Sequence, residues 1–138
     1  GIALDEKNSR IFVADYLTGL FVIDTNTGAV TAIENTADAH LGGIDGLYLY
    51  DDSLIGIQNG TTPQRIIRIG LNDDATEVTT FITMQQALEE WNEPTHGAVV
   101  GDEFRYIATS NWPSYDQEWN VREDAELQPV RIMSLPLK

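Results

Sequence analysis

Short apolar runs separated by polar turns follow one another along almost the whole chain. Runs of this length, bounded by Gly, Asp, Asn and Ser, are typical of β-strands, and no amphipathic stretch long enough for a helix precedes residue 84. The pattern therefore predicts an all-β chain in which only 84–91 forms one or two helical turns. The predicted strands are 2–4, 10–14, 20–24 and 30–34, then 47–50, 54–58, 65–71 and 78–83, and finally 98–100, 105–109 and 130–135.

The strand pattern repeats three times. Each repeat opens at a glycine, and these glycines, at positions 1, 46 and 97, are 45 and 51 residues apart. This period is typical of the four-stranded antiparallel blade of a β-propeller. The predicted blades are 1–41, 42–94 and 95–138, and the last lacks its fourth strand. Because propellers typically have about four to eight blades, we expect a partial propeller, completed by the remaining N-terminal blades of the same propeller or by a second copy of the chain.

Composition excludes several classes of function. The 22 Asp and Glu residues outnumber the 8 Lys and Arg residues, giving a net charge of −14. Nucleic acids and anionic membranes are therefore not expected as partners. The absence of cysteine excludes disulfides, thiolate zinc sites and thiol catalysis. No apolar run approaches the roughly 18 residues that a membrane-spanning helix needs.

Polar residues mark the ends of several predicted strands. In antiparallel blades, the loop entering the first strand and the loop leaving the second open at the same end. Oxygen-rich sets of side chains suit hard cations such as Ca²⁺ and Mg²⁺. Asp and Asn at strand ends also cap turns and tie blades together, so both roles stay open. The candidates at this end are Asp45 and His96, which precede first strands, and Asp15, Asn59, Asn111 and Trp112, which follow second strands.

Two of these features leave further alternatives open. His96 is either a catalytic residue that transfers a proton or a hydrogen-bonded structural residue. The segment 112–128 is longer than the corresponding loops and carries Trp112, Tyr115 and Trp119 among acidic and amide side chains. It is expected to lie over the same end, as a lid on a ligand pocket or as packing against a neighbouring blade.

The string Ile44-Asp45-Gly46-Leu47, with Gly1-Ile-Ala-Leu-Asp5 one repeat earlier, resembles the SMP-30/gluconolactonase/luciferin-regenerating-enzyme family of six-bladed, NHL-like β-propellers. The match covers essentially the whole chain and corresponds to blades four to six, the C-terminal half of such a propeller. Leu54-Ile-Gly-Ile-Gln-Asn-Gly60 and Glu93-Pro-Thr-His-Gly-Ala-Val99 are also similar to gluconolactonase-like sequences.

The resemblance implies a divalent-metal-dependent hydrolase that acts on a lactone or a related small ester. Asp45 is then a metal ligand and candidate base, and the cation is Ca²⁺ or another divalent ion (Mg²⁺, Zn²⁺ or Mn²⁺). The family's Asn ligand corresponds to the position before Gly1, and its Glu ligand lies further upstream. Ile44 stands where the family has proline. Family members favour a periplasmic or secreted location, with a signal upstream of Gly1. The alternative is a non-catalytic propeller that binds a small ligand or a protein.

Overall fold

The computed structural model describes every residue from Gly1 to Lys138. It contains twelve strands and two 3₁₀-helices of three residues each, with no α-helix. The strands form three sheets that are antiparallel apart from one short parallel pair, so the all-β prediction is confirmed. The chain divides into two compact units, Gly1–Gln86 and Ala87–Lys138, called unit 1 and unit 2. No helix is long and apolar enough to cross a lipid bilayer.

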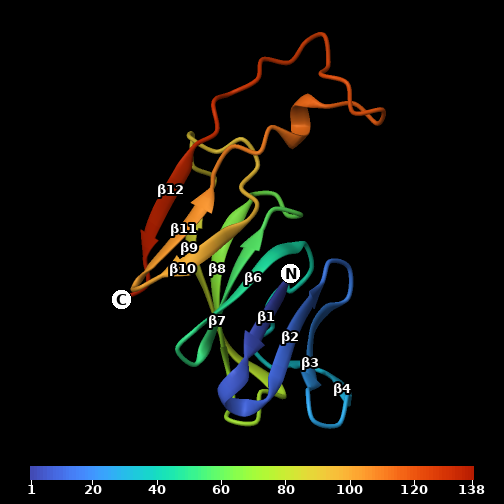
Figure 1. Ribbon diagram of the computed structural model, residues 1–138, viewed down its shortest axis with the longest axis vertical. Helices are drawn as coiled ribbons and strands as arrows, with labels where there is room; N and C mark the ends of the chain where they lie inside the picture. Colours follow the sequence, from blue (N-terminus) through green and yellow to red (C-terminus); the bar gives the residue numbers. More distant parts are fainter. The chain divides into compact units, whose positions relative to one another are not determined.

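The first sheet of unit 1, drawn in blue in Figure 1, follows the chain order of its four strands. Alternation of side chains gives this sheet two faces, and Ala3, Phe12 and Val22 are buried on one of them. The 3₁₀-helix η1 (Glu6–Asn8) turns the chain between the first two strands. The strands are β1 (Ile2–Asp5), β2 (Arg10–Asp15), β3 (Gly19–Asp24) and β4 (Val30–Ala32).

The opposite face of the first sheet is largely apolar, with Asp15 at the end of β2 as a polar residue on it. The register aligns two rows of side chains across the four strands. At the margins of this face, Ile2, Leu4 and Val30 are 69%, 53% and 63% exposed. An apolar face of this size on a sheet ordinarily packs against another surface. The two rows are Ile2, Val13, Phe21 and Ala32, and Leu4, Ile11, Ile23 and Val30.

The second sheet of unit 1 has five strands in the order β5-β9-β8-β7-β6. It packs on the buried face of the first sheet, where β6 contacts β1 and β2. Leu47, Leu54 and Ile69 belong to the shared core, together with Phe12 and Val22 of the first sheet. The strands are β5 (Glu34–Asn35), β6 (Ile44–Tyr50), β7 (Ser53–Gln58), β8 (Arg65–Leu71) and β9 (Glu77–Gln86).

Two predicted elements differ from the structure. The prediction of helical turns at 84–91 is wrong, because Gln85 and Gln86 continue β9 by pairing with Ile66 and Arg65 of β8. The predicted strand 30–34 divides at Ile33. Its last residue, Glu34, leaves the first sheet and pairs in parallel with Glu77 of β9. In both places a non-local strand partner decides the conformation, which local sequence preference does not reveal.

Unit 2 is built on a three-stranded sheet. Its order is β10-β11-β12, and the fourth strand that the first repeat has is absent from it, as predicted. Phe104 and Tyr106 are buried on β11 and their rings stack at 5.8 Å. The Trp91 ring packs edge-on against Tyr106, and its Nε1 donates to the Tyr106 hydroxyl at 3.1 Å. The strands are β10 (Gly97–Val100), β11 (Glu103–Ile107) and β12 (Ile132–Pro136).

Candidate functional site

Three segments meet at one end of unit 1: the turn after β2, the entry to β6 and the loop after β7. The Gly43 amide donates to the Tyr16 carbonyl oxygen at 2.7 Å, and the Gly60 amide donates to the Gly43 carbonyl oxygen at 3.1 Å. Gly43 has φ +72°, and a Cβ there would lie 2.9 Å from the Gly60 backbone. The close approach of the segments therefore requires glycine at position 43.

Asp45 lies where these segments meet, at the end of a chain of hydrogen bonds that runs from Tyr16 through Asn59. Asn59 donates from Nδ2 to Asp45 Oδ2 at 3.0 Å, and the Tyr16 hydroxyl donates to Asn59 Oδ1 at 3.3 Å. The start of β1 also lies here, because a Cβ on Gly1 would be 2.8 Å from the Asp45 carbonyl oxygen. Asp45 and Asn59 are both half-buried. Asp45 and Asn59, which the directions of the strands predict at the same end, are thus in direct contact.

In this cluster the Asn59 amide holds one carboxylate, that of Asp45, and the Tyr16 phenol in turn holds the amide. No group of three or more His, Asp or Glu side chains in the structure is arranged to hold a metal ion. The amide oxygen of Asn59 already accepts the Tyr16 hydrogen bond. Within this cluster of Asp45, Asn59 and Tyr16, Asp45 supplies the one carboxylate.

Gln58, at the end of β7, supports the entry to this site. It is fully buried, and its Nε2 donates to the carbonyl oxygens of His40 at 2.8 Å and Gly42 at 2.6 Å. Its Oε1 accepts a hydrogen bond from Arg65 Nε at 2.6 Å. Gln58 therefore fixes the segment leading into Asp45. Sequence reasoning assigned it no such role, although an amide closing the apolar run Leu54–Gln58 was a usable signal.

A hollow of about 410 Å³ opens beside the same segments of unit 1. His40 and Arg65 line it together with the loop after β7, which includes Gly60, Thr61 and Pro63. His40 is exposed here. The volume falls within the range of small-molecule pockets, roughly 300–1,000 Å³.

Asp15 is the last residue of β2, and its side chain turns into the loop that follows. Its Oδ1 accepts hydrogen bonds from the Thr18 hydroxyl at 2.7 Å and from the Thr18 and Leu17 amides at 2.8 and 3.0 Å. These bonds, that of the Thr18 hydroxyl above all, lower the pKa of the Asp15 carboxyl. The side chain therefore stabilises the β2–β3 turn as a hydrogen-bonded cap.

His96, Asn111 and Trp112 belong to unit 2. His96 is exposed and borders a shallow hollow of about 250 Å³ next to Tyr106 and Ile132. Asn111 is buried and bonds both ways with Gln128: Nδ2 donates to its carbonyl oxygen and Oδ1 accepts from its amide, each at 2.9 Å. Asn111 therefore closes the segment 112–128 at its base. Trp112 begins the 3₁₀-helix η2 (Trp112–Ser114) and is 48% exposed.

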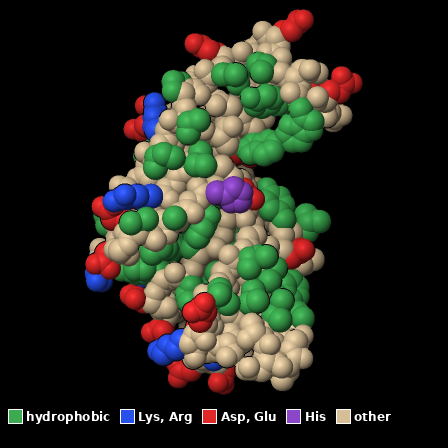
Figure 2. Space-filling model, viewed as in Figure 1, with side chains coloured by type: hydrophobic (Ala, Val, Ile, Leu, Met, Phe, Trp, Pro, Cys, Tyr) green, Lys and Arg blue, Asp and Glu red, His purple; other side chains and the backbone are tan.

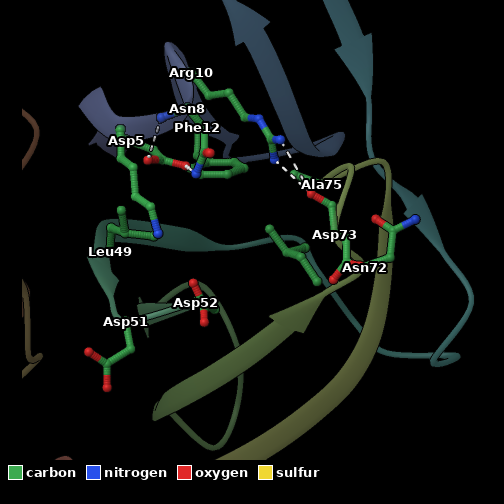
Figure 3. Close-up of a pocket in the computed structure, with 12 residues that line it drawn as sticks. Asp5, Asn8, Arg10, Phe12, Leu49, Asp51, Asp52, Asn72, Asp73 and Ala75 are labelled. Carbon is green, nitrogen blue, oxygen red and sulfur yellow. Dashed lines mark hydrogen bonds between the residues drawn. The ribbon is translucent and has the colours of Figure 1, made fainter.

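A larger hollow, of about 780 Å³, lies at the other end of the strands of unit 1 (Figure 3). Its lining combines Phe12 and Leu49 with the turns after β1, β6 and β8. The Arg10 guanidinium donates to the Asp73 carbonyl oxygen at 3.3 Å through both terminal nitrogens, and so ties the β8–β9 turn to the first sheet. Sequence reasoning did not anticipate this contact, because the two residues are 63 positions apart.

A scan against models of known protein families gives no match for this chain, and a search of curated proteins gives none either.

Proposed function

We propose that this chain is part of a β-propeller similar to the SMP-30/gluconolactonase type and that the Asp45 end of unit 1 contributes to its ligand site. The proposed reaction is hydrolysis of a lactone or a related small ester with the help of a divalent cation. The observation that carries the proposal is the meeting of Asp45 with Asn59, Tyr16 and the start of β1. Asp45 is half-buried, and Gly60, which follows its partner Asn59 in the chain, lines a hollow of ligand size.

The apolar face of the first sheet supports the propeller assignment. In a propeller each blade packs face to face with its neighbours, and this sheet already packs so on the second sheet. Its other face carries eight apolar side chains in two rows, with Asp15 as a polar residue at the end of β2. A further blade, from the same protein or from a second copy of the chain, accounts for such a face. The charge of −14 makes nucleic acid and anionic membranes poor candidates.

Asp45 supplies one ligand of the proposed divalent cation, which is Ca²⁺, Mg²⁺, Zn²⁺ or Mn²⁺. The remaining ligands would come from outside these 138 residues, as the family resemblance implies, and no group of three or more His, Asp or Glu side chains within the chain is arranged to hold a metal ion. His96 and Trp112, with Asp15, Asn59 and Asn111, remain proposed contributors to catalysis or to ligand binding. Hydrogen bonds already give Asp15 and Asn111 a structural role.

Replacing Asp45 by asparagine is expected to lower the affinity for Ca²⁺ by about 100-fold, because a ligand charge is lost at the cation. The measurement is calorimetric titration of Ca²⁺ into the protein that contains this chain. The control is Asp74→Asn, which removes an exposed carboxylate in the turn between β8 and β9 and should leave the affinity unchanged. Equal Ca²⁺ affinity of the two variants contradicts the proposal.

The second candidate is a non-catalytic propeller that binds a small ligand or a protein at the same end. The hydrogen bond from Asn59 to Asp45 favours it, since an amide already satisfies one carboxylate oxygen. Turnover of lactones separates the two functions. Ligand binding that depends on Asp45, proceeds without any divalent cation and is accompanied by no hydrolysis supports the binding module.

A further inference from the structure

Two tryptophans of unit 2 form an exposed aromatic corner, defined by Trp112 and Trp119. Their ring centroids are 5.0 Å apart and the ring planes are inclined at 65°. Trp112 is 48% exposed and Trp119 is 65% exposed. Burying an indole ring stabilises a protein more than burying most other side chains, and these two partly exposed rings do not make that full contribution. An exposed aromatic pair of this kind is therefore a candidate binding surface.

The segment that carries the corner is held by its own hydrogen bonds. The Asp116 carboxylate accepts from the amides of Glu118 and Asn120, both at 2.9 Å, and the Trp119 amide donates to the Asp116 carbonyl oxygen at 3.2 Å. Tyr115 and Val121 form an antiparallel bridge. The corner is thus pre-organised, which reduces the entropy that binding costs.

The charges around the corner indicate which ligand it takes. The segment 112–128 contains five carboxylates and one guanidinium, that of Arg122. Arg122 is itself paired with Asp124 at 3.2 Å. The hydrogen bonds of Asp116, chiefly that from the Asn120 amide, lower the pKa of its carboxyl, so this group is ionised at neutral pH. Figure 2 shows hydrophobic and acidic side chains exposed side by side over this segment, which Figure 1 draws in orange.

We propose that the Trp112–Trp119 corner binds a small organic cation that carries a quaternary ammonium group. A trimethylammonium group is apolar enough to pack on both rings, and its charge is attracted to their faces and to the surrounding carboxylates. An anionic ligand is repelled by the same carboxylates. A neutral apolar ligand gains the packing but not the charge interaction. This site shares no residue with the Asp45 cluster and does not depend on a metal ion.

The test is a titration of the protein with choline, followed through the indole Nε1–H signals of its three tryptophans by NMR. We expect saturable shifts for Trp112 and Trp119 and none for Trp91, whose Nε1 is bonded to Tyr106. The neutral carbon isostere of choline, in which a tert-butyl group replaces the trimethylammonium group, is expected to bind about tenfold more weakly. Sodium chloride at matched ionic strength serves as the blank.

Trp119→Leu keeps apolar bulk but removes the ring, and it is expected to weaken choline binding about tenfold. Leu127→Ala is the control, because it shortens another exposed apolar side chain of the same segment and should leave the affinity unchanged. An unshifted Trp91 signal in both variants shows that the sheet of unit 2 is folded. Equal affinities for choline and its isostere, equal effects of the two substitutions, or no saturable shift overturns the proposal. Asp45→Asn should leave choline binding intact, so this test is independent of the proposed hydrolase.

Discussion

Gln58→Leu is expected to lower the free energy of unfolding by about 3 kcal/mol. Leucine fills a similar volume but leaves the His40 and Gly42 carbonyl oxygens and the Arg65 Nε without the partner that Gln58 provides. A buried polar group that loses its hydrogen bond costs about 1–3 kcal/mol, and the cost per group is at the low end here because His40 is exposed and Gly42 and Arg65 are half-buried. A urea titration measures the change as a lower midpoint at constant slope.

Gln86→Leu is the matched control for Gln58→Leu. Gln86 faces solvent on β9, opposite Arg65 in the register, and its replacement is expected to change the stability by less than about 0.5 kcal/mol. Hydrogen exchange adds a local measurement. The Gly43 amide, which donates to Tyr16, should exchange faster in the Gln58 variant, because the segment before Asp45 is no longer fixed. Equal stability of the two variants contradicts the role assigned to Gln58.

Asn111→Ala is expected to destabilise unit 2 by about 3 kcal/mol. The substitution removes both hydrogen bonds to Gln128 and that from Asn92 Nδ2, which is 3.3 Å from Asn111 Oδ1. It also places alanine at φ 61°, a conformation that asparagine tolerates better. Thermal unfolding followed by the signal of the buried Tyr106 measures the loss.

Asn111→Gly separates the two causes. Glycine accepts the positive φ without strain but makes no side-chain bonds, so this variant should be about 1 kcal/mol more stable than Asn111→Ala. The difference in free energy of unfolding between Asn111→Gly and the parent chain then measures the contribution of the hydrogen bonds that close the segment 112–128. If both variants are as stable as the parent chain, Asn111 does not brace this segment.

The order of the strands was predictable because alternation and turn residues are local signals. The segment 65–71 was predicted as a strand, and β8 has these bounds. The meeting of Asp45 and Asn59 followed from the directions of the strands, whereas the hydrogen bond from Tyr16 to Asn59 was not predicted. Local signals do not show which hydrogen-bond partner a polar side chain takes in the fold. Asp15 bonds to its own turn, a choice that the residue type alone leaves open.

Long-range contacts account for most of what the sequence did not predict. β9 continues through Gln86 because β8 offers pairing partners there. The sequence around Gln58 does not indicate whether its side chain faces solvent or is buried. In the structure it is buried and bonds to two carbonyl oxygens and to Arg65. Within 112–128, the Trp112–Trp119 corner depends on the turn that Asp116 forms with Asn120, and the aromatic content alone did not specify it.

A crystal structure of the protein that contains this chain, grown with Ca²⁺ and examined by anomalous scattering, tests the Asp45 assignment most directly. The proposed function predicts a calcium peak at about 2.3–2.6 Å from an Asp45 carboxylate oxygen, with the other ligands coming from outside residues 1–138. An Asp45 carboxylate that keeps its hydrogen bond to Asn59 and has no anomalous peak within coordinating distance, at a Ca²⁺ concentration that saturates any site seen by calorimetry, contradicts it.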